Sequence, residues 1–84
     1  MAAKYVVGDC VRVPDGRIGR VRARVGAQWR VRVRRPSGSS DQFLLLPARE
    51  LRRVPTPEGW MTPAGYRRYL KATLAKLRAR LRRP

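Results

Sequence analysis

Two stretches decide the fold of this chain, Arg20-Val21-Arg22-Ala23-Arg24-Val25 and Trp29-Arg30-Val31-Arg32-Val33-Arg34. In each of them, apolar and basic residues alternate at every position. A period of two is typical of a β-strand with one face on a core and the other face in solvent. Because only a short segment with a glycine separates the two stretches, we expect them to form an antiparallel hairpin.

The length of the hairpin loop decides which side chains face each other. Residues directly opposite in an antiparallel pair point to the same side of the sheet. A two-residue loop would set Arg24 opposite Trp29, so the apolar faces would disagree. We therefore expect a three-residue loop, Gly26-Ala27-Gln28, which makes these faces coincide. The resulting pairs are Val25–Trp29, Ala23–Val31 and Val21–Val33 on the apolar face, and Arg24–Arg30, Arg22–Arg32 and Arg20–Arg34 on the basic face.

The six arginines of the basic face, which we call the arginine ladder, indicate an anionic partner. Like charges directly opposite each other destabilise a sheet by about a few tenths of a kcal/mol per pair, and residues 20–34 contain no acid. The guanidinium group binds phosphate or carboxylate through two parallel hydrogen bonds. We favour a nucleic-acid backbone as the partner. The alternatives are an acidic protein surface and a strand face that is simply solvated.

The composition is that of a strongly basic protein without catalytic machinery. The chain has 84 residues, with 21 Lys and Arg against 5 Asp and Glu, and a net charge of +16. Histidine is absent, which removes the commonest general base and most zinc sites. The single cysteine, Cys10, is expected to be an unreactive thiol in a strand. We therefore expect no enzyme activity, no metal, no cofactor and no small-molecule substrate.

The sequence predicts a protein that does not enter a membrane. No apolar run approaches the roughly 18 residues that a membrane-spanning helix needs. The N-terminal apolar segment is also too short for a signal peptide. We expect a cytoplasmic protein.

Further short apolar segments, separated by turn signals, extend the hairpin into a mainly-β fold. We expect strands near residues 11–13, 43–46 and 51–54, and one helical turn within 47–51. The composition divides the chain into a β-domain (residues 1–55), a Pro/Gly connector (56–61) and a helix (62–84). The expected core consists of Val11, Val13, Ile18, Val21, Val25, Trp29, Val31, Val33, Phe43 and Leu45.

The C-terminal segment predicts one amphipathic, basic α-helix. Thr62 is a good N-cap, and Pro63 suits the first helical position. Apolar residues then recur every three or four positions, which places them on one face of the helix. This apolar stripe consists of Tyr66, Leu70, Leu74, Leu77 and Leu81.

The helix is too long to lie along the small β-domain over its whole length. We expect Tyr66, Tyr69 and Leu70 to pack on the domain together with Trp60. The exposed end of the stripe is expected to dock a partner protein. Fraying of the last turns, binding to a membrane surface and self-association are the alternatives. The docking residues are Leu74, Leu77 and Leu81.

The run Gly8-Asp9-Cys10-Val11-Arg12-Val13, followed by a turn at Pro14-Asp15-Gly16 and by Gly19-Arg20-Val21, resembles the opening of a KOW-type, SH3-like small barrel. The resemblance covers residues 5–54. It implies a strongly bent, five-stranded SH3-like barrel. Members of this family occur in ribosomal proteins and transcription elongation factors and bind RNA or protein. The resemblance slightly favours RNA over DNA as the ligand.

The sequence as a whole predicts a non-enzymatic, nucleic-acid-binding module that contacts the phosphate backbone. We expect it to be an accessory subunit of a larger nucleoprotein complex. The alternative is an adaptor that binds an acidic protein surface and docks a partner through its leucine-striped helix. The residues expected to bind nucleic acid are Arg20, Arg22, Arg24, Arg30, Arg32 and Arg34 of the ladder, and Arg67, Arg68, Lys71 and Arg78 of the helix.

Overall fold

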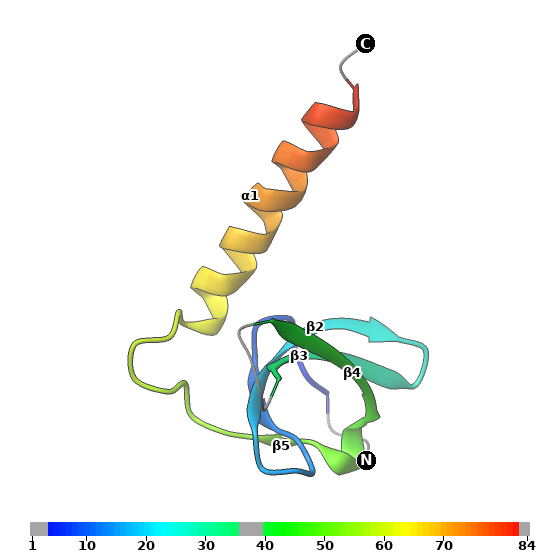
Figure 1. Ribbon diagram of the computed structural model, residues 1–84, viewed down its shortest axis with the longest axis vertical. Helices are drawn as coiled ribbons and strands as arrows, with labels where there is room; N and C mark the ends of the chain where they lie inside the picture. The colour runs from blue at the N-terminus through cyan, green and yellow to red at the C-terminus, as the bar shows by residue number, and fades with distance from the viewer. Residues whose placement is uncertain (1–3, 36–39, 83–84) are drawn as a thin grey trace.

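The computed structural model describes residues 4–35 and 40–82 and consists of a five-stranded antiparallel sheet followed by one helix (Figure 1). Residues 1–3, 36–39 and 83–84, which belong to the predicted β-domain and helix, lie outside the described part. The prediction of a mainly-β fold with one C-terminal helix is confirmed. The elements are β1 (Cys10–Arg12), β2 (Ile18–Val25), β3 (Gln28–Arg34), β4 (Asp41–Pro47), a 3₁₀ turn (Ala48–Glu50), β5 (Arg52–Arg53) and α1 (Pro63–Arg82).

The strands are arranged in the order β4-β3-β2-β1-β5, and one face of the curled sheet covers the core. Tyr5, from the segment before β1, completes this core. Its ring meets Trp29 edge-on at 5.7 Å, and its hydroxyl donates a hydrogen bond of 2.9 Å to the Leu51 carbonyl. The strands and the N-terminal segment therefore pack on one common apolar cluster. The buried members of the cluster are Tyr5, Val11, Val13, Val21, Trp29, Val31, Val33 and Leu51.

The predicted register of the β2–β3 hairpin is wrong. The loop has two residues, Gly26 and Ala27, and Val25 pairs with Gln28. Gly26 adopts φ +61°, as the first central residue of a type II′ hairpin turn requires. A β-bulge at Arg22 then restores the match of the apolar faces, so that Val21 lies opposite Val31.

The bulge also changes the pairing of the arginines. Arg20 pairs with Arg32 instead of Arg34, and Ala23 pairs with Arg30. Arg24 lies opposite Trp29, so a basic and an apolar residue face each other, as expected for a two-residue loop. Its guanidinium carbon is 5.8 Å from the centre of the Trp29 ring, so a cation–π contact offsets the mismatch. The regular ladder of three arginine pairs does not exist.

The prediction that Val25, Phe43 and Leu45 belong to the core is wrong. In β4, Phe43 pairs with Arg32 and Leu45 pairs with Arg30, which places both on the outer face of the sheet. They are 52% and 47% exposed, and Val25 is 37% exposed. Leu44 and Leu46 face the core instead. Of the other predicted core residues, Ile18 is half-buried and the remaining six are buried.

The start of α1 is held against the loop that precedes β1. Gly8 has φ +100°, and a Cβ atom on it would lie 2.6 Å from the Pro63 carbonyl oxygen. Only glycine allows this close approach. Arg67 Nη1 donates a hydrogen bond of 3.2 Å to the Val7 carbonyl one turn further along the helix. The Thr62 hydroxyl caps the helix by accepting a hydrogen bond of 3.1 Å from the Gly65 amide, as predicted.

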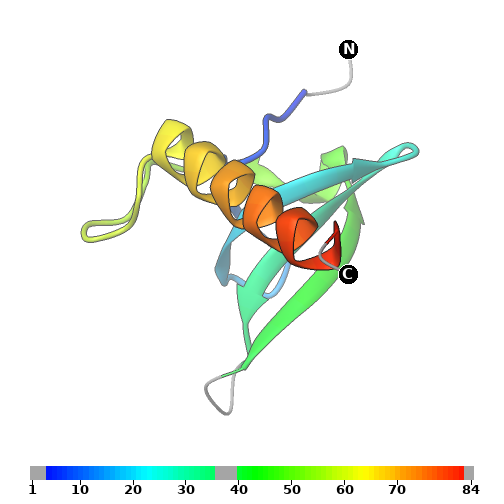
Figure 2. The same ribbon diagram turned by 90° about the horizontal axis from the view of Figure 1, so that it is seen from above.

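Beyond its first turns, α1 rises away from the sheet (Figure 1), and in the view from above it passes in front of the strands (Figure 2). Tyr66 is buried and Leu70 is half-buried, whereas Tyr69 is 50% exposed, which corrects its predicted packing. The predicted exposure of the last leucines is confirmed, with Leu74 and Leu77 at 50% and Leu81 at 78%. In the part of the chain that the structure describes, no helix combines the length and apolar character needed to cross a bilayer.

Candidate functional site

Arg20, the first arginine of the ladder, is buried and stabilises the fold. The residue is only 6% exposed. Nη1 donates a hydrogen bond of 2.7 Å to the Gly8 carbonyl, and Nη2 donates one to the Met61 carbonyl. Its guanidinium carbon lies 4.8 Å from the Tyr66 ring centre and 5.6 Å from that of Trp60. Arg20 therefore joins β2 to the start of α1, and its guanidinium is not available to a ligand.

Arg32 is engaged by an acid from a third strand. Its Nε donates a hydrogen bond of 2.8 Å to the Asp41 carboxylate, and Nη2 donates another to the same oxygen. These bonds raise the pKa of Arg32. The repulsion expected between Arg20 and Arg32 is relieved, since one guanidinium binds backbone carbonyls and the other a carboxylate.

A cavity of about 480 Å³ lies beside these two arginines. Tyr66 also lines it, and the Tyr66 hydroxyl is buried without a hydrogen-bond partner among the described residues. Arg34 is the one exposed arginine on its wall. Because Arg20 and Arg32 are already paired, this cavity offers an anion little unsatisfied positive charge. The cavity is lined by Ile18, Arg20, Arg32, Val33, Arg34, Asp41, Trp60, Met61 and Tyr66.

Five cations that form no ion pair among the described residues lie elsewhere, around a groove between α1 and the outer face of the sheet. Two adjoining cavities of about 450 and 400 Å³ share Arg22, Leu70 and Leu74 as lining residues. We call their union the helix–sheet groove. Its lining residues are Arg22, Ala23, Arg30 and Phe43 from the sheet, Val7 from the N-terminal segment, and Arg67, Leu70, Lys71, Leu74, Ala75 and Arg78 from α1.

The local sequence explains how both walls of the groove are built. The bulge at Arg22 places this residue on the outer face next to Ala23, where regular alternation would have turned one of them inward. Arg67, Lys71 and Arg78 are spaced by four and seven residues, so they lie on one side of α1. Five cations thus surround the groove.

The groove carries positive charge without an acid among its described lining residues. Three of the five acids of the chain form ion pairs elsewhere, Asp9 with Arg53, Asp15 with Arg17 and Asp41 with Arg32. The Arg17 guanidinium also lowers the pKa of Asp15. Glu50 and Glu58 are exposed and do not line the groove. The charged side chains that line the groove are therefore all cations.

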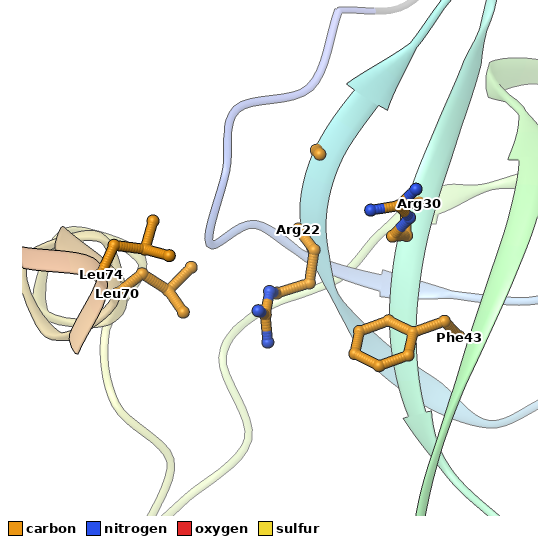
Figure 3. Close-up of a pocket in the computed structure, with 6 residues that line it drawn as sticks. Arg22, Arg30, Phe43, Leu70 and Leu74 are labelled. Atoms are coloured by element: carbon orange, nitrogen blue, oxygen red, sulfur yellow. The ribbon is translucent and has the colours of Figure 1, made fainter. Parts of the chain in front are cut away.

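The floor of the groove is apolar and aromatic (Figure 3). Leu70 and Leu74 point from α1 toward Arg22, and Phe43 lies on the far side of Arg22 on β4. The guanidinium carbon of Arg22 is 5.4 Å from the centre of the Phe43 ring. Arg30 stands beside this pair on β3 and makes no hydrogen bond or ion pair within the described residues. The aromatic ring of Phe43 and the guanidinium groups of Arg22 and Arg30 are therefore neighbours in the groove.

The structure brings together part of the predicted site. Arg22, Arg30, Arg67, Lys71 and Arg78 line the groove, and so does Leu74, which was predicted to dock a partner. The other predicted residues lie outside the groove.

The remaining arginines of the ladder have different surroundings. Arg20 is buried, and Arg32 forms an ion pair with Asp41. Arg34 borders the cavity beside Arg20 and Arg32, and Arg24 donates a hydrogen bond of 3.1 Å to the Gly26 carbonyl. On α1, the predicted residues that are exposed outside the groove are Arg68, Leu77 and Leu81.

Phe43 is the functional candidate that the sequence interpretation placed wrongly. Residues 43–46 are all apolar, so alternation does not tell which of them face the core. The signal was Asp41, which follows the loop after Arg34. Asp41 lies opposite Arg34 in the register and forms its ion pair with Arg32, and this register puts Phe43 beside Arg32 on the outer face.

Cys10 and the acids form no further site. Cys10 is 2% exposed, and its thiol lies 3.9 Å from the Thr56 hydroxyl. Asp9 accepts a hydrogen bond of 2.9 Å from the Val6 amide and shapes the turn before β1. Within residues 4–35 and 40–82, no three His, Cys, Asp or Glu side chains come together as metal ligands would.

Comparisons with protein-family models, with curated proteins and with solved structures found no match to this chain.

Proposed function

We propose that this protein is a non-enzymatic, nucleic-acid-binding module that holds a phosphate backbone along the helix–sheet groove. The observation that carries the proposal is the set of five cations around the groove, with no acid among its described lining residues. The phosphate oxygens of a nucleic acid would neutralise these cations, which have no acidic side chain beside them in the groove. Arginine and lysine side chains on a groove wall position a backbone without reading its sequence.

The arrangement favours a chain of phosphates over a single small anion because the cations are spread along a channel. Arg22 and Arg30 stand on the sheet, whereas Arg67, Lys71 and Arg78 follow α1 over three turns. A linear polyanion can touch both rows in succession. The resemblance of residues 5–54 to KOW-type domains adds weight to RNA as the natural ligand.

Binding is expected to depend steeply on salt. Five contacts to a single strand correspond to a slope of about −3.5 in a plot of log affinity against log salt, from about −0.7 per phosphate. Affinity for a fluorescent oligonucleotide should therefore fall about a hundredfold between about 50 and 200 mM salt. Fluorescence anisotropy measures both the affinity and the slope. A flat salt dependence would contradict phosphate binding.

Removing charge from the groove is expected to weaken binding more than removing the same charge elsewhere. Arg30, Lys71 and Arg78 make no hydrogen bond or ion pair within the described residues, so their change to Gln should leave the fold intact. The matched control changes Arg35, Arg49 and Arg52 to Gln, which are exposed and lie outside the groove. Both variants carry 16 − 3 = +13.

We expect the groove variant to lose tenfold or more in affinity and the control to lose far less, with a shallower salt slope for the groove variant alone. Equal losses in the two variants would mean that binding follows net charge and that the groove is not the site.

A protein partner is favoured by the outer half of α1. Leu77 and Leu81 are exposed beyond the groove, on the same stripe as Leu74. We propose that they attach the module to a larger nucleoprotein complex. The double variant Leu77→Gln and Leu81→Gln should lose the proteins that copurify with the chain after nuclease treatment, while its affinity for oligonucleotides stays unchanged. Loss of nucleic-acid binding in this variant would contradict the division of α1 into two surfaces.

A further inference from the structure

We infer that the helix–sheet groove takes a single-stranded nucleic acid, with a base stacked at Phe43 and the flanking phosphates on the cations of the two walls. This inference rests on the proposed function and adds the kind of strand to it. The juxtaposition that carries it is an exposed aromatic ring on β4, a guanidinium over that ring, and two leucines facing them from α1 (Figure 3).

Phe43 leaves about half of its side chain open to a ligand. The ring is 52% exposed on a face where its neighbours in the sheet, Arg30 and Arg32, are cations. Leu74, across the groove, is 50% exposed as well. A surface that only had to hold phosphates would gain nothing from these apolar groups, and a duplex keeps the faces of its bases stacked inside, so that only base edges, sugars and phosphates are accessible. The bases of a single strand are uncovered and present an apolar π face.

The polar groups of the groove suit bases and phosphates and do not suit a peptide. Every polar side chain among the described lining residues is a guanidinium or an ammonium group, which only donates hydrogen bonds. Phosphate oxygens and the ring nitrogens and carbonyls of bases are acceptors. A peptide also carries amide donors, for which these side chains provide no acceptor.

The two cavities have room for one or two bases, while the neighbouring nucleotides of the strand place their phosphates along the cationic walls. The two cavities measure about 450 and 400 Å³ and join at Arg22, Leu70 and Leu74. A base can stack on the Phe43 ring or on the guanidinium plane of Arg22, since both surfaces stack bases. Arg30 and Lys71 then lie on opposite walls for the phosphates on either side. Such contacts are tolerant of sequence, so we expect only weak base preference.

The test compares a single strand with a duplex of the same sequence. Phe43→Leu keeps an apolar side chain but removes the π face, and the exposed position makes unfolding a minor concern. Base–aromatic stacking predicts a loss on the order of tenfold for the single strand and no loss for the duplex. The salt slope of the variant should equal that of the wild type, because the phosphate contacts remain.

Tyr69→Leu is the matched control, since Tyr69 is 50% exposed on α1 and does not line the groove. It should change neither affinity. Equal losses for single strand and duplex in Phe43→Leu, or no loss for either, would overturn the inference while the effect of the groove charges still supports the proposed function. Tighter binding of an acidic amphipathic peptide than of the single strand would also overturn it. If neither form of nucleic acid binds, the proposed function itself fails.

Discussion

Gly19→Ala is expected to destabilise the sheet by about 3 kcal/mol, at the upper end of what overpacking a core costs. A Cβ atom at this position would lie 2.5 Å from Val33 Cγ1, 2.8 Å from Val31 Cγ1 and 2.6 Å from the Arg32 carbonyl oxygen. Two of these atoms belong to fully packed β-branched side chains and the third to the backbone of β3, so none can move away cheaply. Gly19 also pairs with Val11, in the centre of the sheet.

For a domain of this size the melting temperature should fall by about 12–24 °C, measured by circular dichroism. The steric cause can be separated from a general glycine effect by a double-mutant cycle with Val33→Ala. This change removes the nearest of the three atoms at the cost of a cavity. If the clash explains the loss, the two substitutions together destabilise less than the sum of the single effects. Additive losses, or a melting temperature of Gly19→Ala close to that of the wild type, would contradict the explanation.

The strands were predictable because the alternation in residues 20–34 has only one structural reading, and the helix was predictable from its cap and stripe. The register of the hairpin was not predictable. A β-bulge adds one residue to β2 and so shifts which residues lie opposite each other, but the alternation of residues 20–25 continues through the bulge and does not reveal it. The rule that apolar faces must match was correct in itself. The chain satisfies it with a bulge at Arg22 and a short loop at Gly26, whereas the prediction satisfied it with a longer loop.

The candidate site was predictable only as a list of cations. The sequence gives no measure of which arginines find partners inside the protein. Arg20 and Arg30 are equivalent in the alternation, yet one is buried between two aromatic rings and the other lines the groove. The groove itself joins residues more than 40 positions apart, such as Arg22 and Leu70, and depends on where α1 starts. Its aromatic floor was hidden because Phe43 begins a wholly apolar run.

Arg20→Met is expected to release α1 from the sheet, and with it one wall of the groove. The methionine side chain retains most of the apolar stem but leaves the carbonyls of Gly8 and Met61 without their charged donor. Hydrogen bonds to charged groups contribute about 1.5–3 kcal/mol each, and a buried acceptor left unpaired costs a similar amount. The rings of Tyr66 and Trp60 also lose their cation. We expect a loss of about 3 kcal/mol in stability, concentrated at the joint.

Amide hydrogen exchange distinguishes release of the helix from general unfolding. In Arg20→Met, the amides around the joint should exchange faster, in particular those of Gly8, which donates to the Val21 carbonyl, and of Tyr66, which donates to the Thr62 carbonyl. The amides between β2 and β3 should keep their protection. Arg24→Met is the matched control, because it removes an exposed arginine of the same strand whose side chain, among the described residues, donates a hydrogen bond only to the Gly26 carbonyl.

Arg20 lies outside the helix–sheet groove, so any effect of Arg20→Met on nucleic-acid affinity must act through the position of α1. The proposed function requires both walls, and it therefore predicts that this variant binds more weakly, with a salt slope reduced by the contacts of Arg67, Lys71 and Arg78. A variant that exchanges rapidly at the joint but binds with wild-type affinity and slope would mean that the sheet holds the ligand without the helix. The cations of α1 would then contribute nothing to the site, and the groove proposed for a single strand would reduce to the face that carries Arg22, Arg30 and Phe43.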